Sequence, residues 1–375
     1  MRRTLEAIVS NHPRLRPLAG LAIAGVLVLA GCSQASPTVP SPTTPGTSAD
    51  GTTEPDAQAG GEVVLIAHDS FTFPDDLLAK FEQETGYTLK VTQSGDGGQL
   101  ANQLTLTKDA PLADAFFGVD NSFISALIDG GVVDPYRPQS LPADAAGFDA
   151  DAVGSVAPVD HGYVCVNVDD AWFAEKKIAA PATFEDLTDP AYKGLTVVID
   201  PTASSPGAAF LFATVAAFGE DGYEDYWTDL LANDARVDQG WSDAYYTDFS
   251  GAGEGGKYPI TVSYNTSPAY TVAEGAKDSS TSALLDTCTS QIEYAGVLAG
   301  AKNPAGARAV IDFLVSQDFQ DTVAETMYMY PVIDAAVPAE WDKWAPLPES
   351  SIDLDPADLS AGRTKWLDAW SQLAG

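Results

Sequence analysis

The chain has 375 residues and is strongly acidic: 53 Asp and Glu residues against 19 Lys and Arg residues give a formal net charge of −34 at neutral pH. Such a surface repels the phosphate backbone of nucleic acids and anionic lipid headgroups, which argues against nucleic-acid binding. A negative surface favours a cationic ligand, but solubility or a salty habitat explains the same charge equally well.

The first 31 residues have the composition of an export signal. An uncharged apolar run over residues 18–30 follows four arginines, and it suits a signal-peptide core but is short for a membrane span. The run ends in Leu29-Ala30-Gly31-Cys32, which resembles the lipobox of bacterial lipoproteins. We therefore expect a lipoprotein signal peptide over residues 1–31 and a lipid anchor at Cys32. The alternative is an ordinary secretory signal with a chance cysteine.

Residues 32–60 are rich in Pro, Thr, Ser, Gly and Asp and contain few apolar side chains that a core would bury. They are predicted to form a disordered tether, which its prolines keep extended. Residues 61–375 remain for the folded part. Because this is longer than one hydrophobic core usually serves, we expect two lobes.

The folded part begins with alternating strands and helices. Strands are expected at residues 63–67, 88–92 and 113–119, with helices between them. This alternation predicts a mostly parallel α/β sheet, whose ligands bind beyond the carboxyl ends of the strands. Three acidic residues follow these strands: Asp69, Asp96 and Asp120.

Two chain crossings are predicted between the lobes. Residues 160–168 resemble a strand that leaves lobe 1, and residues 260–264 resemble a strand that returns. We therefore predict an α/β, two-lobed fold with mixed, mostly parallel sheets and hinge crossings. Its lobe 1 comprises residues 61–160 and 265–335, and its lobe 2 comprises residues 161–264.

A C-terminal helical segment, residues 336–375, is expected to pack on the lobes. Asp355 is placed to cap its helix. The apolar side chains of that helix share one face, which indicates packing rather than function. They are Leu359, Trp366, Leu367, Trp370 and Leu373.

Three cysteines are present, and Cys32 is assigned to the lipid. Cys165 and Cys288 would face an oxidising exterior, where an even number of thiols is more often bridged than free. We predict a disulfide between them, although their spacing in the sequence does not show how closely they approach.

Enzyme signatures are sparse. Gly240-Trp241-Ser242-Asp243-Ala244 departs from the nucleophile elbow at its last residue, and HExxH, GxxxxGK[ST] and EF-hand patterns are absent from the sequence. A secreted hydrolase using Asp96 and Asp120 as paired carboxylates is the remaining enzymatic alternative. We expect a protein that is not an enzyme and that needs neither cofactor nor metal.

Several motifs follow one another in a fixed order between Val63 and Leu373: Asp69-Ser70-Phe71, Asp96-Gly97, Gly118-Val119-Asp120-Asn121, Asp200-Pro201, Ser204-Ser205-Pro206-Gly207, Gly240-Trp241-Ser242-Asp243-Ala244-Tyr245, Ser263-Tyr264-Asn265-Thr266-Ser267-Pro268-Ala269-Tyr270 and Met329-Tyr330-Pro331-Val332. In their order and spacing the chain resembles the thiamine-binding periplasmic proteins, a branch of the type II solute-binding superfamily near the ferric-ion binders. The resemblance implies an extracytoplasmic binding lipoprotein of an ABC importer. Its partners would be the permease subunits, and its ligand thiamine or the phosphate esters of thiamine.

Thiamine combines a flat aminopyrimidine, a cationic thiazolium and a hydroxyethyl arm, so its recognition needs aromatic faces, a carboxylate and, for a phosphate ester, an anion site. The resemblance assigns the aromatic contacts to Trp241, Tyr264 and Tyr270. It assigns the polar contacts to Asp96, Gly97, Asp120 and Ser267. The phosphate site is expected at a helix N-terminus, at Ser204, Ser205 and Gly207. The structural alternatives are half-buried aromatics, turn residues and an ordinary helix cap.

Two residues depart from the family pattern. His68 stands where the relatives have a stacking tyrosine, and Tyr328 stands where they have a tryptophan, so both are expected in a modified ligand site. A ferric-ion or polyamine binder on the same fold is the main alternative, because Tyr245-Tyr246 resembles the tyrosine pair of ferric sites. The adjoining Trp241 motif favours thiamine.

Overall fold

The computed structural model describes residues 60–252 and 255–375. The predicted signal peptide, the anchor at Cys32 and all of the predicted tether except residue 60 lie outside the described residues. Within the described part, no helix combines the length and the apolar character needed to cross a membrane.

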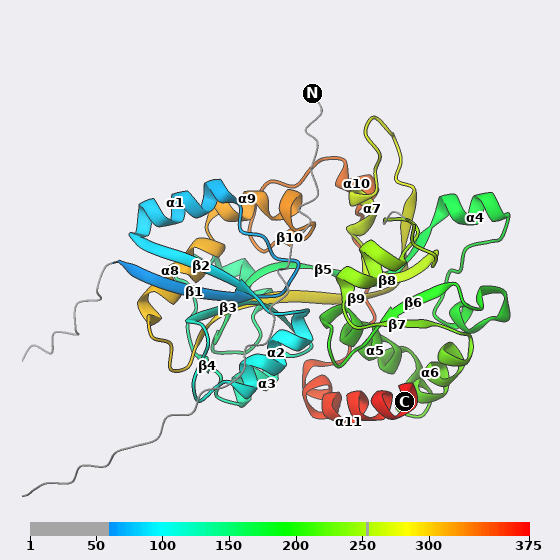
Figure 1. Cartoon of the computed structure of the whole chain (residues 1–375), viewed down its shortest axis with the longest axis horizontal. Helices are drawn as coiled ribbons and strands as arrows, with labels where there is room; N and C mark the ends of the chain where they lie inside the picture. Colours follow the sequence, from blue (N-terminus) through cyan, green and yellow to red (C-terminus); the bar gives the residue numbers. More distant parts are fainter. Residues whose placement is uncertain (1–59, 253–254) are drawn as a thin grey trace, which may run out of the picture. The chain divides into compact units, whose positions relative to one another are not determined.

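One ten-stranded sheet runs through the described part of the chain, in the order β2-β1-β3-β9-β5-β8-β6-β7 (Figure 1). The short strand β4 pairs with β9, and β10 pairs with β5. The strands are β1 (Gly61–Ala67), β2 (Tyr87–Gln93), β3 (Ala115–Asp120), β4 (Val133–Asp134), β5 (Ala157–Asp169), β6 (Thr196–Ile199), β7 (Arg236–Asp238), β8 (Ile260–Tyr264), β9 (Thr281–Leu298) and β10 (Tyr330–Pro331).

The first half of the sheet is built on β1, which pairs in parallel with β2 and β3. Its side chains alternate between two cores: Val63 and Leu65 pack with one set of helices, and Ile66 packs on the opposite face. The first set is α1 (Asp75–Thr85), α8 (Pro304–Leu314) and α9 (Gln317–Thr326). The opposite face carries α2 (Gly97–Leu106) and α3 (Ile124–Asp129).

The second half is built on β6, which pairs in parallel with β7 and β8. Its central helix is α5 (Ser205–Phe218), which is apolar on nearly all sides and is buried over most of its length. The remaining helices are α4 (Asp170–Lys176), α6 (Tyr223–Ala232), α7 (Ser267–Tyr270), α10 (Trp341–Trp344) and α11 (Pro356–Ala374).

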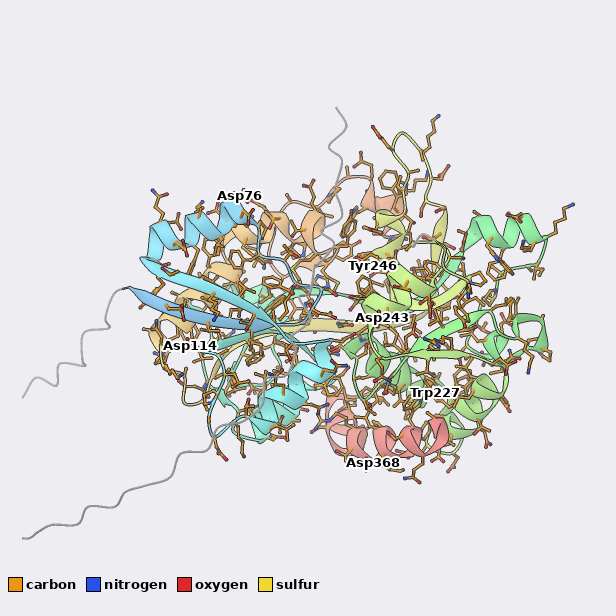
Figure 2. The ribbon with its side chains drawn as sticks, viewed as in Figure 1. Asp76, Asp114, Trp227, Asp243, Tyr246 and Asp368 are labelled. Atoms are coloured by element: carbon orange, nitrogen blue, oxygen red, sulfur yellow. A yellow bond between two sulfur atoms is a disulfide. The ribbon has the colours of Figure 1, made fainter. Side chains whose placement is uncertain are left out.

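The C-terminal helix α11 packs against α5 and α6. Asp355 caps it by accepting a hydrogen bond from the backbone N–H of Ala357 at 2.9 Å. Its buried side chains are Trp366 and Trp370. Trp370 lies edge-on to Trp227 of α6, with ring centroids 5.7 Å apart. Figure 2 labels Trp227, between the ribbons of α6 and α11. The predicted apolar face therefore serves packing.

Strands β5 and β9 join the two halves. They pair antiparallel along most of their length, and β9 also pairs with β3 while β5 also pairs with β8. The two long strands are therefore the hinge crossings, and they confirm the predicted two-lobed α/β fold with mixed pairing. The sheet is not mostly parallel, because β5 and β9 pair antiparallel with each other and with their outer neighbours β8 and β3. The return crossing predicted at residues 260–264 is wrong: this strand is β8, which pairs with β6 in the second half, and β9 makes the second crossing instead. The division of residues between lobes stays a proposal.

Cys165 of β5 and Cys288 of β9 form a disulfide with a Cα–Cα distance of 4.2 Å. The bond closes a loop across a sequence separation of 123 residues. Closing a long loop restricts the unfolded chain, a contribution that is worth roughly 2–5 kcal/mol in small secreted domains. Because both cysteines lie on the crossing strands, the bond also fixes these strands to each other.

Candidate functional site

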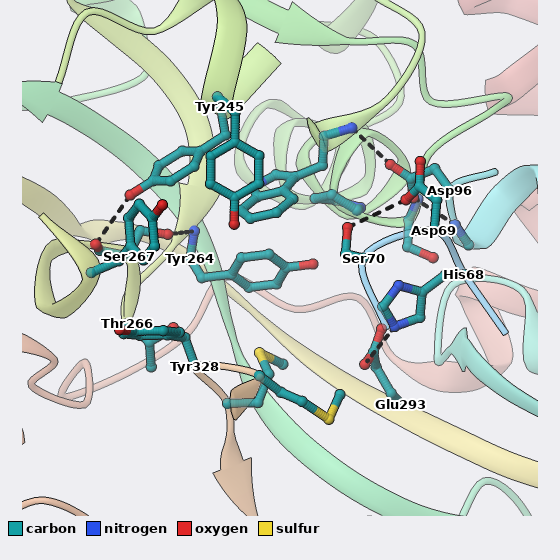
Figure 3. Close-up of a pocket in the computed structure, with 18 of the residues that line it drawn as sticks. His68, Asp69, Ser70, Asp96, Tyr245, Tyr264, Thr266, Ser267, Glu293 and Tyr328 are labelled. Carbon is teal, nitrogen blue, oxygen red and sulfur yellow. Dashed lines mark hydrogen bonds and ion pairs between the residues drawn. The ribbon is translucent and has the colours of Figure 1, made fainter. Parts of the chain in front are cut away.

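A cavity of about 200 Å³ lies where the two halves of the sheet meet (Figure 3). Its walls come from the segment after β1, the N-termini of α2 and α5, the segment after β7, the β8–α7 turn, strand β9 and the segment between α9 and β10. Most of the residues singled out from the sequence line it: His68, Asp96, Gly97, Ser205, Trp241, Tyr264, Ser267, Tyr270 and Tyr328. Three others do not line it: Asp120, Ser204 and Gly207.

One wall of the cavity is aromatic. Trp241 stacks on Tyr245 with ring centroids 5.0 Å apart and an interplanar angle of 11°. Tyr264 meets Trp241 edge-on at 5.8 Å, and Tyr270 meets Tyr328 edge-on at 5.4 Å. Such a wall offers π faces and ring edges to a flat or cationic ligand.

Trp241 is held by hydrogen bonds at both ends. Its indole Nε1–H donates to Ser263 Oγ at 2.9 Å, and its backbone N–H donates to Asp96 Oδ2 at 2.8 Å. Ser263 Oγ in turn lies 2.7 Å from Ser267 Oγ, which accepts from the backbone N–H of Tyr264 at 3.1 Å. Ser267 therefore positions the aromatic wall.

Asp96 connects the two halves of the molecule. Its carboxylate accepts backbone N–H groups from Gly97 at 2.6 Å, Ser205 at 3.0 Å and Trp241 at 2.8 Å. Burial raises the pKa of Asp96, and these hydrogen bonds oppose the rise. Asp96, which the sequence predicted to bind the ligand, therefore mainly links α2 to α5 and to the segment that carries Trp241.

Gly97 makes this close approach possible. A Cβ at this position would lie 2.1 Å from Ser205 Oγ and 3.0 Å from the carbonyl oxygen of Gly118. A side chain would therefore push α2 away from α5. Gly97 lines the cavity. The reason for a glycine at this position is the close packing of α2 against α5, which leaves no room for a side chain.

The N-terminus of α5 is already occupied by protein groups. Ser204 is a buried N-cap whose Oγ accepts from the N–H of Gly207 at 3.2 Å, and the N–H of Ser205 is bound to Asp96. Pro206 has no N–H. A carboxylate of the chain itself therefore stands where the sequence predicted a phosphate, and Ser204 and Gly207 serve the helix cap.

Asp120 lies outside the cavity lining, in a row of carboxylates across three adjacent strands. The register places Asp120 of β3 opposite Glu293 of β9, and Glu293 opposite Asp160 of β5. Asp120 and Asp160 are completely buried, and Glu293 is 6% exposed. Burial raises the pKa of Asp120 to about 7. Burial and the neighbouring Glu293 raise the pKa of Asp160 well above its ordinary value.

His68 stands at the edge of this row. Its Nε2 lies 3.7 Å from Glu293 Oε2 (Figure 3). Its ring is tilted by 49° against the ring of Phe117. Burial is the largest single influence and lowers the pKa of His68, but attraction and hydrogen bonding to Glu293, together with the charges of Asp96 and Asp69, outweigh it, so the pKa is raised. The residue expected to stack on a ligand is therefore also an ion-pair partner.

Sequence reasoning did not assign several cavity residues to the site. Tyr246 was considered only in a ferric-type pair with Tyr245. Tyr245, Ser70 and Met329 were otherwise only parts of longer motifs. Glu293 was not considered at all. A signal for Glu293 existed, because it is the one charged residue in the otherwise largely apolar run over residues 292–298.

The sequence matches the family model described as bacterial extracellular solute-binding protein over residues 110–353, which is more than half of the chain. The chain belongs to this family. The solute-binding proteins of this family bind their ligands without converting them, so the protein is not an enzyme. The family description also places it outside the cytoplasm.

Individual relatives of this solute-binding protein agree with the family assignment. The thiamine-binding periplasmic protein of Escherichia coli strain K12 is 28% identical over 319 residues, covering 83% of this chain and 92% of that protein. A solved periplasmic thiamin binding protein superposes with a TM-score of 0.71 at 26% identity, covering 84% and 96% of the two chains. Iron-bound HitA from Pseudomonas aeruginosa superposes with a TM-score of 0.63 at 20% identity over 84% of this chain and 99% of that one, which shows the shared fold alone.

Proposed function

We propose that the protein is the solute-binding component of an ABC importer and that its ligand is thiamine. The observation that carries the proposal is the aromatic wall around Trp241, which faces buried and exposed carboxylates across the same cavity. A flat aminopyrimidine suits the aromatic faces, and the thiazolium cation suits both the π systems and the carboxylates. The names of the relatives support the same ligand.

We propose that thiamine binds more tightly than its phosphate esters. The cavity lining contains three carboxylates, Asp69, Asp96 and Glu293, and no Lys or Arg. The N–H groups at the start of α5 are paired within the protein. A phosphate would therefore meet like charge in a cavity whose lining has no Lys or Arg to balance it.

The ferric-ion alternative is less well supported. A tyrosine pair that binds iron needs both hydroxyls free to face the metal, but Tyr245 is 1% exposed and donates its hydroxyl to the Ser267 carbonyl at 3.1 Å. Its ring is also stacked against Trp241. Tyr245 therefore supports the aromatic wall, and Tyr246 alone of the pair is exposed.

We also propose that Cys32 carries a lipid that holds the protein at the outer face of the cell membrane, where it delivers ligand to the permease subunits. The proposal rests on the lipobox-like sequence before Cys32 and on the composition of residues 32–60. Replacing Cys32 by Ala is expected to release the protein from the membrane fraction. Retention of this variant in the membrane would contradict the lipid anchor.

Calorimetric titration of the purified protein tests the ligand. Thiamine is expected to bind one to one and more tightly than its monophosphate, its diphosphate, putrescine or ferric citrate. All ligands are titrated in one buffer, so that pH and salt concentration are the same for every affinity compared. Tightest binding of putrescine or ferric citrate would replace thiamine by the corresponding alternative.

A further inference from the structure

Glu293 is the buried carboxylate that the cavity leaves available to a ligand. Asp96 also lines the cavity, but its oxygens accept three backbone N–H groups, and Asp69 lies exposed at the rim. Among the described residues, Glu293 has one ion-pair partner, His68. Figure 3 shows this pair on the side of the cavity opposite Tyr245.

The strand register limits the charge that this region can hold. Asp120 and Asp160 flank Glu293 on the neighbouring strands, and both are completely buried. Both oxygens of Asp160 and one oxygen of Asp120 have no hydrogen-bond partner among the described residues. Like charges on adjacent strands, removed from water, raise one another's pKa, so they ionise together only at higher pH. Glu293 is the member of the row that is paired with a potential cation and reaches the cavity.

We propose that Glu293 is the counter-ion for the positive charge of the ligand, and that the ligand replaces protonated His68 as its partner, so that binding releases a proton from His68 to solvent. This inference rests on the proposed function, because it requires a cationic ligand. No covalent bond changes other than the N–H bond of His68. Two cations beside one carboxylate repel each other, and His68 is the cation that can become neutral.

As pH rises, the titratable groups around Glu293 and His68 change the charge of the site in one direction. On the elements packed around the pair, these groups are Asp69 after β1, Asp96 at α2, Asp120 of β3, Asp160 of β5 and Tyr264 of β8. The charge of Asp120 also acts on Arg363 of α11, but Arg363 does not line the cavity. As pH rises, His68 loses its proton and Asp120 ionises at about 7. Both changes make the site more negative, so affinity for a cation is expected to rise with pH.

The first test compares thiamine with its thiophene analogue, which has nearly the same shape but lacks the positive charge. The wild-type protein is expected to prefer thiamine. Glu293→Gln is expected to weaken thiamine binding at least about tenfold and binding of the analogue less than about threefold. Asp312→Asn, which removes a half-buried carboxylate outside the cavity lining, serves as the matched control and is expected to change neither affinity.

The second test counts protons. Titrations with thiamine at pH 7 in buffers of different ionisation enthalpy are expected to show release of up to one proton in the wild type and none in His68→Gln. Equal weakening of both ligands by Glu293→Gln would overturn the counter-ion role. Thiamine binding without proton release would overturn the exchange with His68. If the wild type binds neither ligand, the proposed function fails and this inference fails with it.

Discussion

Asp120 provides a quantitative test of the buried carboxylate row. Its carboxyl group is completely buried, and its pKa is raised from 3.8 to about 7, mainly by burial. Asp120→Asn keeps the size of the side chain and an oxygen that can accept the hydrogen bond from the N–H of Ser122. The substitution therefore removes the titration while changing little else.

The direction of the effect follows from proton binding. Between pH 3.8 and about 7 the folded protein holds a proton on Asp120 that the unfolded chain has lost, so this group makes the free energy of unfolding fall as pH rises. Its favourable contribution is complete below pH 3.8 and is lost by about pH 7. At about 1.36 kcal/mol per pKa unit, the wild type loses up to roughly 4 kcal/mol relative to Asp120→Asn across this window.

Urea unfolding of the wild type and Asp120→Asn at pH 4, 6 and 8 measures this difference. The two proteins are expected to have similar stability at pH 4, and Asp120→Asn is expected to be more stable by about 2–4 kcal/mol at pH 8. In the difference between the two unfolding free energies, the contributions of the other acidic groups cancel, apart from those of groups that interact with Asp120. A constant difference across the pH range, or a variant that loses stability at pH 8, would refute the raised pKa.

Three further predictions concern the cavity and the hinge. Trp241→Ala is expected to weaken thiamine binding by roughly 1–3 kcal/mol, measured by calorimetry, whereas Trp366→Ala, on the buried face of α11, is expected to cost about 3–5 kcal/mol of unfolding free energy and to leave affinity unchanged; the opposite pattern would place Trp241 in the core. Mass spectrometry after alkylation without reduction is expected to leave Cys165 and Cys288 unmodified, and modification of both would exclude the disulfide. Small-angle scattering is expected to show a smaller radius of gyration with thiamine than without it, because a ligand held between lobes favours their closed arrangement. An unchanged radius at saturating thiamine would count against hinge closure.

Much of the fold was predictable because strands and helices leave local patterns. The continuous apolar run at residues 63–67 predicts the strand β1, and the capped apolar face after Asp355 predicts the helix α11; the structure contains both. Strand β9 was harder to predict, because Thr287, Gln291 and Glu293 place polar groups in a strand that is largely buried. Its polar residues are explained only by neighbouring strands that are remote in the sequence.

The site was predictable to the extent that its residues lie in contiguous motifs. The Trp241 and Tyr264 motifs led to residues that line one cavity. The distinct roles of Asp96 and Glu293 were not predictable in this way. A carboxylate after a strand suits a ligand contact as well as a clamp, and the donors that occupy Asp96 come from Ser205 and Trp241 in the other half of the molecule.

A crystal structure of the protein grown with thiamine tests the central claim most directly. The account predicts one thiamine molecule in the cavity between the two halves, with its rings against the wall formed by Trp241, Tyr264 and Tyr270 and its thiazolium within ion-pair distance of Glu293. Thiamine bound only elsewhere, for example in the separate cavity between Phe212 of α5 and Tyr294 of β9, or an empty aromatic cavity at saturating thiamine, would contradict it.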